Sequence, residues 1–143
     1  MSPESRAQSR KHGPAASGDS RALKGKRGLQ RIFNALKYSM DGFAAAWGEE
    51  DAFRQEVALA VILVPTALLL PLDLVERILM ISSIFVVIII ELLNSAVEAA
   101  IDRHSFEINP LAKRAKDLGS AAVMLSLLLA GGIWLAILWS RFG

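Results

Sequence analysis

The sequence of 143 residues contains no cysteine and only two histidines, His12 and His104. The absence of cysteine excludes disulfide bonds and thiolate metal sites. Two histidines that lie so far apart in the sequence do not indicate a zinc site. A nucleotide-binding P-loop is missing as well: residues 13–20 nearly match its glycine-rich pattern, but Asp19 replaces the required lysine and no strand precedes the segment. The sequence therefore predicts no disulfide bond, no zinc site and no P-loop.

The chain is unusually apolar for its length. Hydrophobic residues make up 53% of it, and the mean hydropathy of +0.40 is too high for an ordinary soluble domain of this size. Residues 1–27 differ, because they hold seven Lys or Arg and two acids among Ser, Gly and Pro. We predict a disordered basic arm over 1–27 and one membrane-embedded domain over 28–143.

Three apolar stretches follow the arm. The first covers 57–70 and extends to about 75, the second covers 78–101, and the third, 121–139, carries no charge. A helix needs roughly 20 apolar residues to cross a bilayer. The sequence therefore predicts an all-α integral membrane protein with three transmembrane helices.

The charges between the stretches predict how the chain is oriented. The N-terminal arm is basic, whereas the link around Asp73 and Glu76 is not. Lysine and arginine collect on the cytoplasmic side of membrane proteins. The connection after the second stretch is also basic, with Arg103, Lys113, Arg114 and Lys116. We therefore expect a cytoplasmic N-terminus and a multi-pass protein.

The segment before the first stretch has helical periodicity. Its apolar residues recur at steps of three and four: Leu29, Ile32, Phe33, Leu36, Met40, Phe43 and Trp47. Its polar face holds Arg31, Asn34, Lys37 and Asp41. This pattern predicts an amphipathic helix on the cytoplasmic leaflet. A helix packed on the protein's own core is the alternative.

Four polar residues share one side of the second predicted span. At about 100° per residue, Glu91, Asn94, Glu98 and Asp102 fall within a sector of roughly 80°. A charge at mid-membrane costs on the order of 2.5–3.5 kcal/mol, so such acids are functional candidates. Two carboxylates near the aqueous side can bind Mg²⁺, and a less hydrated one can act as a base. Alternatively, the amide bonds a neighbouring helix and the acids lie among lipid headgroups.

The next segment has features that suit an anionic ligand. Asn109 is a good N-cap and Pro110 a good first helical residue. Lys113, Arg114 and Lys116 follow on the same helix. Helix N-termini and lysines bind phosphate. The cations can equally serve as topology determinants or lipid-headgroup contacts.

These motifs together resemble the prokaryotic diacylglycerol kinase family, and the resemblance covers about residue 28 to the end. It rests on Glu91-x-x-Asn94-Ser95-Ala96-x-Glu98-x-x-x-Asp102, Ala115-Lys116-Asp117-x-Gly119-Ser120-Ala121-Ala122, Arg31, Tyr38-Ser39, Ala45-Ala46-Trp47 and Glu50-x-x-Phe53-Arg54-Gln55-Glu56.

The resemblance implies a homotrimer with active sites shared between chains, in the bacterial inner membrane. Each chain would contribute three spans and a surface helix. The enzyme would transfer the γ-phosphate of ATP, with Mg²⁺, to diacylglycerol and form phosphatidic acid. Glu91 would be the general base, and Glu50 and Glu98 would hold the metal.

The resemblance also assigns binding residues. The nucleotide would contact Arg31, Tyr38, Glu50, Glu98, Glu107, Lys116 and Asp117. The lipid would contact Arg31, Ser39, Trp47, Arg54, Glu56, Glu91, Asn94 and Ser120.

The loop 104–109 departs from the family pattern, which leaves its nucleotide contacts open. Undecaprenol is an alternative substrate, because related kinases phosphorylate it. An ion-conducting oligomer is an alternative of another class, and no nucleic-acid partner is expected. The apolar run before Glu91 offers only Ser82 and Ser83, which argues against a pore.

Overall fold

The computed structural model describes residues 19–102 and 109–143, with side chains from residue 28 onward. Helix α1 runs from Asp19 to Glu49. Residues 19–27, which we predicted as part of a disordered arm, are therefore helical. Ala22, Leu23 and Lys24 are good helix formers, and their propensity outweighs the polar composition here. The remainder of the predicted arm lies outside the described residues.

The chain divides into two units, which are described separately. The first contains α1 up to Asp41. Every side chain from 28 to 41 is exposed, including the apolar ones of the predicted amphipathic face. These are Leu29, Ile32, Phe33, Leu36 and Met40.

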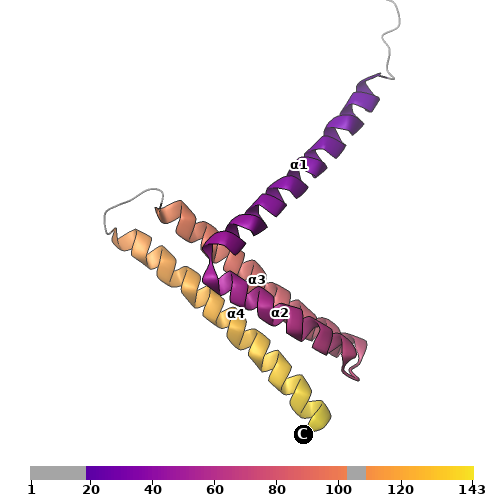
Figure 1. Ribbon diagram of the computed structural model, residues 1–143, viewed down its shortest axis with the longest axis vertical. Helices are drawn as coiled ribbons and strands as arrows, with labels where there is room; N and C mark the ends of the chain where they lie inside the picture. Colours follow the sequence, from indigo (N-terminus) through magenta and orange to yellow (C-terminus); the bar gives the residue numbers. More distant parts are fainter. Residues whose placement is uncertain (1–18, 103–108) are drawn as a thin grey trace, which may run out of the picture. The chain divides into compact units, whose positions relative to one another are not determined.

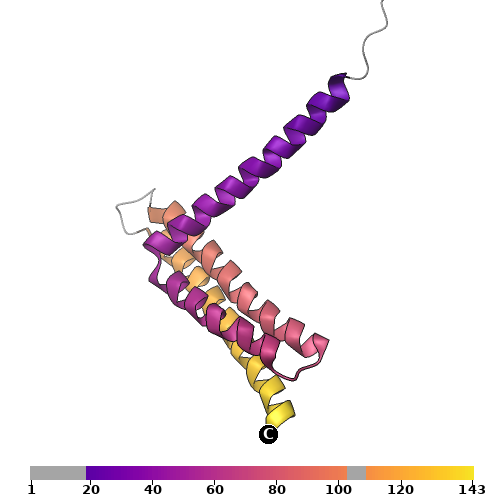
Figure 2. The same ribbon diagram turned by 45° about the vertical axis from the view of Figure 1, so that its right-hand side comes forward.

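The second unit, from Gly42 onward, contains three long helices. They are α2 (Asp51–Leu69), α3 (Leu74–Asp102) and α4 (Pro110–Phe142), and all are long and apolar enough to cross a membrane. Figures 1 and 2 show them side by side, and α3 packs against both of the others. Within the described ranges every regular element is a helix. The predicted all-α chain with three candidate spans is confirmed.

A short turn joins α2 to α3. We expected the first span to continue to about residue 75, which is wrong, because α2 ends at Leu69. Leu70 has extended backbone, and the helical conformation is disfavoured before Pro71. Asp73 then caps α3: its Oδ1 accepts from the Glu76 N–H at 2.9 Å, and its own N–H donates to Glu76 Oε2 at 3.1 Å. This reciprocal pair is a capping box.

The last turn of α4 is tied to this capping box. Arg141 Nε donates to both carboxylate oxygens of Glu76 at 2.9 Å, and its Nη2 donates to Asp73 Oδ2 at 3.0 Å. The Glu76 N–H, helped by the Arg141 charge, holds the pKa of Asp73 below its ordinary value. We call Asp73, Glu76 and Arg141 the turn clasp. It joins the α2–α3 turn to the end of α4.

A cluster of buried apolar residues lies beside the turn clasp. Ala67, Leu72 and Met80 are buried there, and α4 covers them with apolar side chains. Trp134 of α4 donates its indole N–H to the backbone carbonyl of Met80 at 3.2 Å. Because lipid tails cannot accept hydrogen bonds, this contact gives α4 a defined register on α3.

Candidate functional site

Glu91 lies in the middle part of α3, directly after the apolar run 78–90. Only 3% of its surface is exposed, and it is the only buried residue with a charged side chain in the described part of the chain. Burial of a carboxylate without a cation is costly. None of the ion pairs among the described residues involves Glu91. No cation of the described residues therefore offsets this cost through an ion pair, which is typical of a functional acid.

Three further acids lie near enough to Glu91 to interact with its charge. These acids are Glu50, Glu56 and Glu98, and each interacts electrostatically with Glu91. They come from different elements: Glu50 precedes α2 with extended backbone, Glu56 lies in the second turn of α2, and Glu98 follows Glu91 by two turns on α3. The fold thus brings together the three acids of the predicted base and metal site, and adds Glu56.

The predicted metal site can be compared with the groups present. No set of three or more His, Asp or Glu residues is positioned to hold a metal ion within 19–102 and 109–143. Mg²⁺ needs no such set, since it is commonly held by one or two carboxylates together with substrate phosphates and water. Glu50 precedes α2, but its side chain does not cap the helix with a hydrogen bond. Glu50 and Glu98 supply carboxylates, the type of ligand that such a magnesium–nucleotide complex takes.

Asn94 links the acids to α4. Its side-chain Nδ2 donates to Glu98 Oε1 at 3.1 Å. Its Oδ1 is buried and accepts no hydrogen bond from the described residues. Gly119 of α4 lies against the Asn94 amide, and a side chain at position 119 would collide with it. Asn94 thus lies between Glu98 and the backbone of α4.

The beginning of α4 matches its prediction and adds two ion pairs that we did not predict. Asn109 caps the helix, accepting from the Leu111 N–H at 2.9 Å, and Pro110 stands in the first turn, as expected. Lys116 Nζ lies 2.6 Å from Asp102 Oδ1 on α3, and Asp117 accepts from Lys113 at 2.6 Å. Lys116 is thus paired with Asp102, and Asp117 is paired with Lys113. Their predicted contact with the nucleotide stays a prediction.

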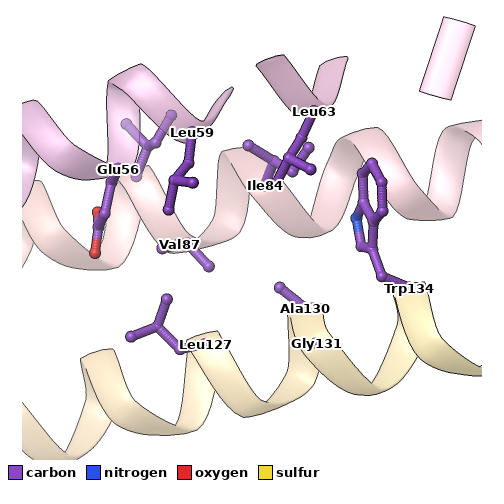
Figure 3. A pocket seen from close by; sticks show the side chains of 10 residues that line it. Glu56, Leu59, Leu63, Ile84, Val87, Leu127, Ala130, Gly131 and Trp134 are labelled. Atoms are coloured by element: carbon purple, nitrogen blue, oxygen red, sulfur yellow. The ribbon is translucent and has the colours of Figure 1, made fainter. Parts of the chain in front are cut away.

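An apolar groove of about 270 Å³ lies between α2, α3 and α4. Figure 3 shows Leu59 and Leu63 on one side and Ala130 and Gly131 on the other. Glu56 is the only charged residue in its lining, and its Oε2 is buried and accepts no hydrogen bond within the described ranges. The groove therefore combines an apolar wall with a single carboxylate.

Trp134 also lines this groove, on the α4 side and away from Glu56 (Figure 3). Ile88 of α3 belongs to the lining too, and Glu91 follows it by about one helical turn. The carboxylate end of the groove is thus adjacent to the buried acid. This arrangement suits a ligand with a polar head and an apolar body.

Arg54, predicted to contact the lipid, is engaged within the protein. It donates to the backbone carbonyls of Trp47 at 2.8 Å and Gly48 at 3.4 Å, and it pairs with Asp51. These contacts satisfy carbonyls at the end of α1, which otherwise lack partners. Trp47, also predicted to bind lipid, is 52% exposed.

The remaining predicted site residues lie in other parts of the chain. Arg31, Tyr38 and Ser39 belong to the first unit, where all three are exposed. Ser39 donates to the Ala35 carbonyl of its own helix at 2.9 Å. Ser120 is exposed on α4, and Glu107 lies outside the described residues.

The site described so far defines a class of protein: a helical chain with three candidate membrane spans that holds a buried carboxylate beside an apolar groove. The family described as prokaryotic diacylglycerol kinase matches residues 37–138. The diacylglycerol kinase of Pseudomonas aeruginosa PAO1 is 51% identical over 116 residues, which cover 81% of this chain and 94% of that protein.

Two other relatives give the same result. The diacylglycerol kinase of Escherichia coli K12 is 47% identical over 116 residues, covering 81% of this chain and 95% of the relative. That of Helicobacter pylori J99 is 43% identical, covering 81% and 87%. The chain belongs to the prokaryotic diacylglycerol kinase family.

Proposed function

We propose that this chain is an integral-membrane lipid kinase that transfers the γ-phosphate of ATP to the primary hydroxyl of diacylglycerol. The observation that carries the proposal is the buried Glu91 beside an apolar groove whose only charged lining residue is Glu56. Relatives that are 43–51% identical and named diacylglycerol kinase support the same activity.

The proposed reaction needs a base, two positioned substrates and charge stabilisation. The hydroxyl proton passes to a carboxylate oxygen of Glu91 while the hydroxyl oxygen forms a bond to the γ-phosphorus. The bond from that phosphorus to the β,γ-bridging oxygen breaks, which releases ADP and leaves phosphatidic acid. Phosphoryl transfer depends mainly on such positioning and on electrostatic stabilisation. The position of Glu91 suits the role, because its carboxylate is buried beside the apolar groove that would hold the lipid.

Glu50 and Glu98 would hold Mg²⁺, which neutralises negative charge on the phosphates when it is bound. Asn94 would keep Glu98 oriented. Lys116 would exchange its contact with Asp102 for a phosphate oxygen, while Asp117 would contact another part of the nucleotide. Arg31, Tyr38 and Glu107 would complete the nucleotide site. On the lipid, Ser39, Trp47, Arg54, Glu56 and Ser120 would join Arg31, Glu91 and Asn94.

We further propose that the N-terminus is cytoplasmic and that the protein lies in the bacterial inner membrane. The basic residues at the Asp102 end of α3 and the start of α4 support this orientation. ATP then reaches Lys116 from the cytoplasm, while the lipid enters the groove from the bilayer. The exposed apolar face of α1 suits a helix lying on the cytoplasmic leaflet.

The proposed assembly is a homotrimer with shared active sites. Met80 is the only large side chain that is fully buried in the described part of one chain. Apolar and polar residues on the outer faces of α3 and α4 therefore remain available to a neighbouring chain. A second copy can then contribute residues to the same site.

An ion-conducting oligomer receives less support. A pore would need polar groups that continue along the span. The buried hydroxyls of Ser83 and Ser126 instead donate to carbonyls of their own helices, each at 2.7 Å. They are thus not free to line a polar path.

The deciding experiment offers the purified protein diacylglycerol or undecaprenol in mixed micelles with γ-labelled ATP and Mg²⁺. We expect labelled phosphatidic acid as the main product and much slower labelling of undecaprenol. Glu91→Gln serves as the matched inactive control, because it keeps the size of the side chain and removes the base. Faster labelling of undecaprenol would reassign the substrate, and no labelling of either lipid would refute the kinase proposal.

A further inference from the structure

Gly119 stands out among the glycines of α4. A Cβ built at Gly119 would collide with Asn94 Oδ1 and would lie 3.2 Å from Asn94 Cγ. Gly131 and Gly132, on the same helix, have open space at the corresponding position. Glycine allows close approach of helices in membranes, and only position 119 uses that property on α4 within the described residues.

The group that Gly119 faces is oriented by a carboxylate. Asn94 Nδ2 donates to Glu98 Oε1 at 3.1 Å, and an ionised carboxylate can only accept. The amide oxygen must therefore point away from Glu98, and it points at the Cα hydrogen of Gly119. Such a hydrogen makes a weak contact with a carbonyl oxygen. The amide is held between α4 and Glu98.

A side chain at 119 could be accommodated in only two ways. Either the Asn94 amide rotates away, which removes the hydrogen bond to Glu98, or α4 moves away from α3. The second change would also stretch the ion pair of Lys116 with Asp102, because Lys116 lies about one turn from Gly119 on α4. Each change displaces a side chain that lies near Glu98.

We propose that Gly119 is a positioning residue for phosphoryl transfer. Its missing side chain lets the backbone of α4 hold the Asn94 amide against Glu98, and this fixes the carboxylate that meets the magnesium–nucleotide complex. The proposal rests on the proposed kinase function for its catalytic consequence. The contact between Gly119, Asn94 and Glu98 is a property of the folded chain.

The first test reads this contact without any enzyme assay. In the full-length protein in detergent micelles, the side-chain amide resonances of Asn94 are recorded by ¹⁵N NMR and assigned through Asn94→Ala. We expect Gly119→Ala to move them in the same direction as Glu98→Gln, which weakens the same hydrogen bond. The matched control Gly132→Ala should leave them in place. Unchanged Asn94 resonances in Gly119→Ala would overturn the proposal, whatever the activity of the protein.

The second test reads the consequence for the reaction. In Gly119→Ala, the Mg²⁺ concentration that gives half-maximal activity should rise about 10- to 100-fold, which is the usual effect of losing a residue that orients a metal ligand. Gly132→Ala should titrate like the wild type. In an Asn94→Ala background the collision is gone, so adding Gly119→Ala should cost less than about twofold more.

Two results of this second test would contradict the proposal. A wild-type magnesium titration in Gly119→Ala would remove Gly119 from the site. An equal loss in both backgrounds would show that Gly119 acts without Asn94. If Gly119→Ala alone fails to fold, the double variant decides, because the proposal requires that Asn94→Ala restore its folding. An inactive wild-type protein would refute the kinase function and leave the NMR result standing.

Discussion

Glu91, Asn94 and Gly119 show what single residues can do in a membrane helix. Glu91 is buried on α3 without an ion pair among the described residues, at a cost on the order of 2.5–3.5 kcal/mol if it is charged at mid-membrane. Asn94 gives one hydrogen bond to Glu98 and leaves its oxygen against a glycine. The hydrophobic packing of the span does not require either polar group. The proposed phosphoryl transfer accounts for their presence.

Replacing Glu91 by Gln should reduce kcat by about 10²- to 10⁴-fold, the usual contribution of a general base. Glutamine keeps the volume and can still form hydrogen bonds, but it cannot take the proton of the lipid hydroxyl. Binding of MgATP, measured by equilibrium titration, should change little. The substitution Glu49→Gln, at an exposed position, controls for the loss of one negative charge. A wild-type kcat in Glu91→Gln would exclude Glu91 as the base.

At the scale of the elements, periodicity and cap residues predicted most of the helices. The three apolar stretches and the Asn109–Pro110 start of α4 are confirmed. The end of α2 was predicted wrongly, because the apolar residues of the turn continue the hydrophobic run while Pro71 breaks the helix. Hydrophobicity shows which segment can lie in a membrane, whereas the backbone geometry imposed by proline determines where the helix ends.

The site was predictable only in part. The spacing of Glu91, Asn94 and Glu98 put them on one face of a helix, and the fold adds Glu50 through its position at the start of α2. The contact between Lys116 and Asp102 was not predictable. It depends on how far α4 lies from α3, and no local pattern reports that distance. The glycine in the motif of residues 115–122 was the only sequence signal that α4 approaches Asn94 closely at position 119.

The turn clasp should make stability sensitive to acid. The pKa of Asp73 is lowered in the folded state, mainly by the Glu76 N–H and further by Arg141. A carboxyl of this kind stabilises the fold above its unfolded pKa of about 3.9, and the contribution is lost as the pH falls through the lower folded value. Thermal unfolding in micelles should therefore show a decrease in midpoint temperature below about pH 4.

The variant Asp73→Asn tests this assignment. It should unfold at a lower temperature than the wild type at pH 6. The difference should shrink as the pH falls from about 4 through the lower folded pKa of Asp73, because below that value Asp73 is protonated in both states of the wild type. Asparagine can still cap a helix, so the comparison isolates the charge. A difference that is constant with pH would show that the Asp73 charge does not stabilise the fold.

At the scale of the whole molecule, one chain has little interior. Met80 is its only fully buried large side chain among the described residues, and the outer faces of α3 and α4 are mostly exposed. Such a surface needs lipid or other copies of the chain to cover it. In a cyclic trimer, each interface pairs one face with a different face of the next chain. A site at that interface can draw Glu91 and Lys116 from different chains.

Mixing two inactive variants should then restore activity. Glu91→Ala and Lys116→Ala, each inactive alone, are unfolded together in equal amounts and refolded. With random assembly, about a quarter of the sites receive both intact residues, so about a quarter of the wild-type activity should return. Mixed trimers are verified by differently tagged chains, and refolded single variants give the baseline. No recovery in verified mixed trimers would place both residues in one chain.

The turn clasp also has a consequence for the order of events during synthesis. Arg141 follows Glu76 by 65 residues in the sequence. Because ribosomes add roughly 5–20 residues per second, Arg141 is synthesised roughly 3–13 s after Glu76. During that interval the α2–α3 hairpin can enter the bilayer before Asp73 and Glu76 have formed their contacts with Arg141. Arrival of the last turn of α4 then closes the clasp. The bundle is thereby fastened only after all three helices have left the ribosome.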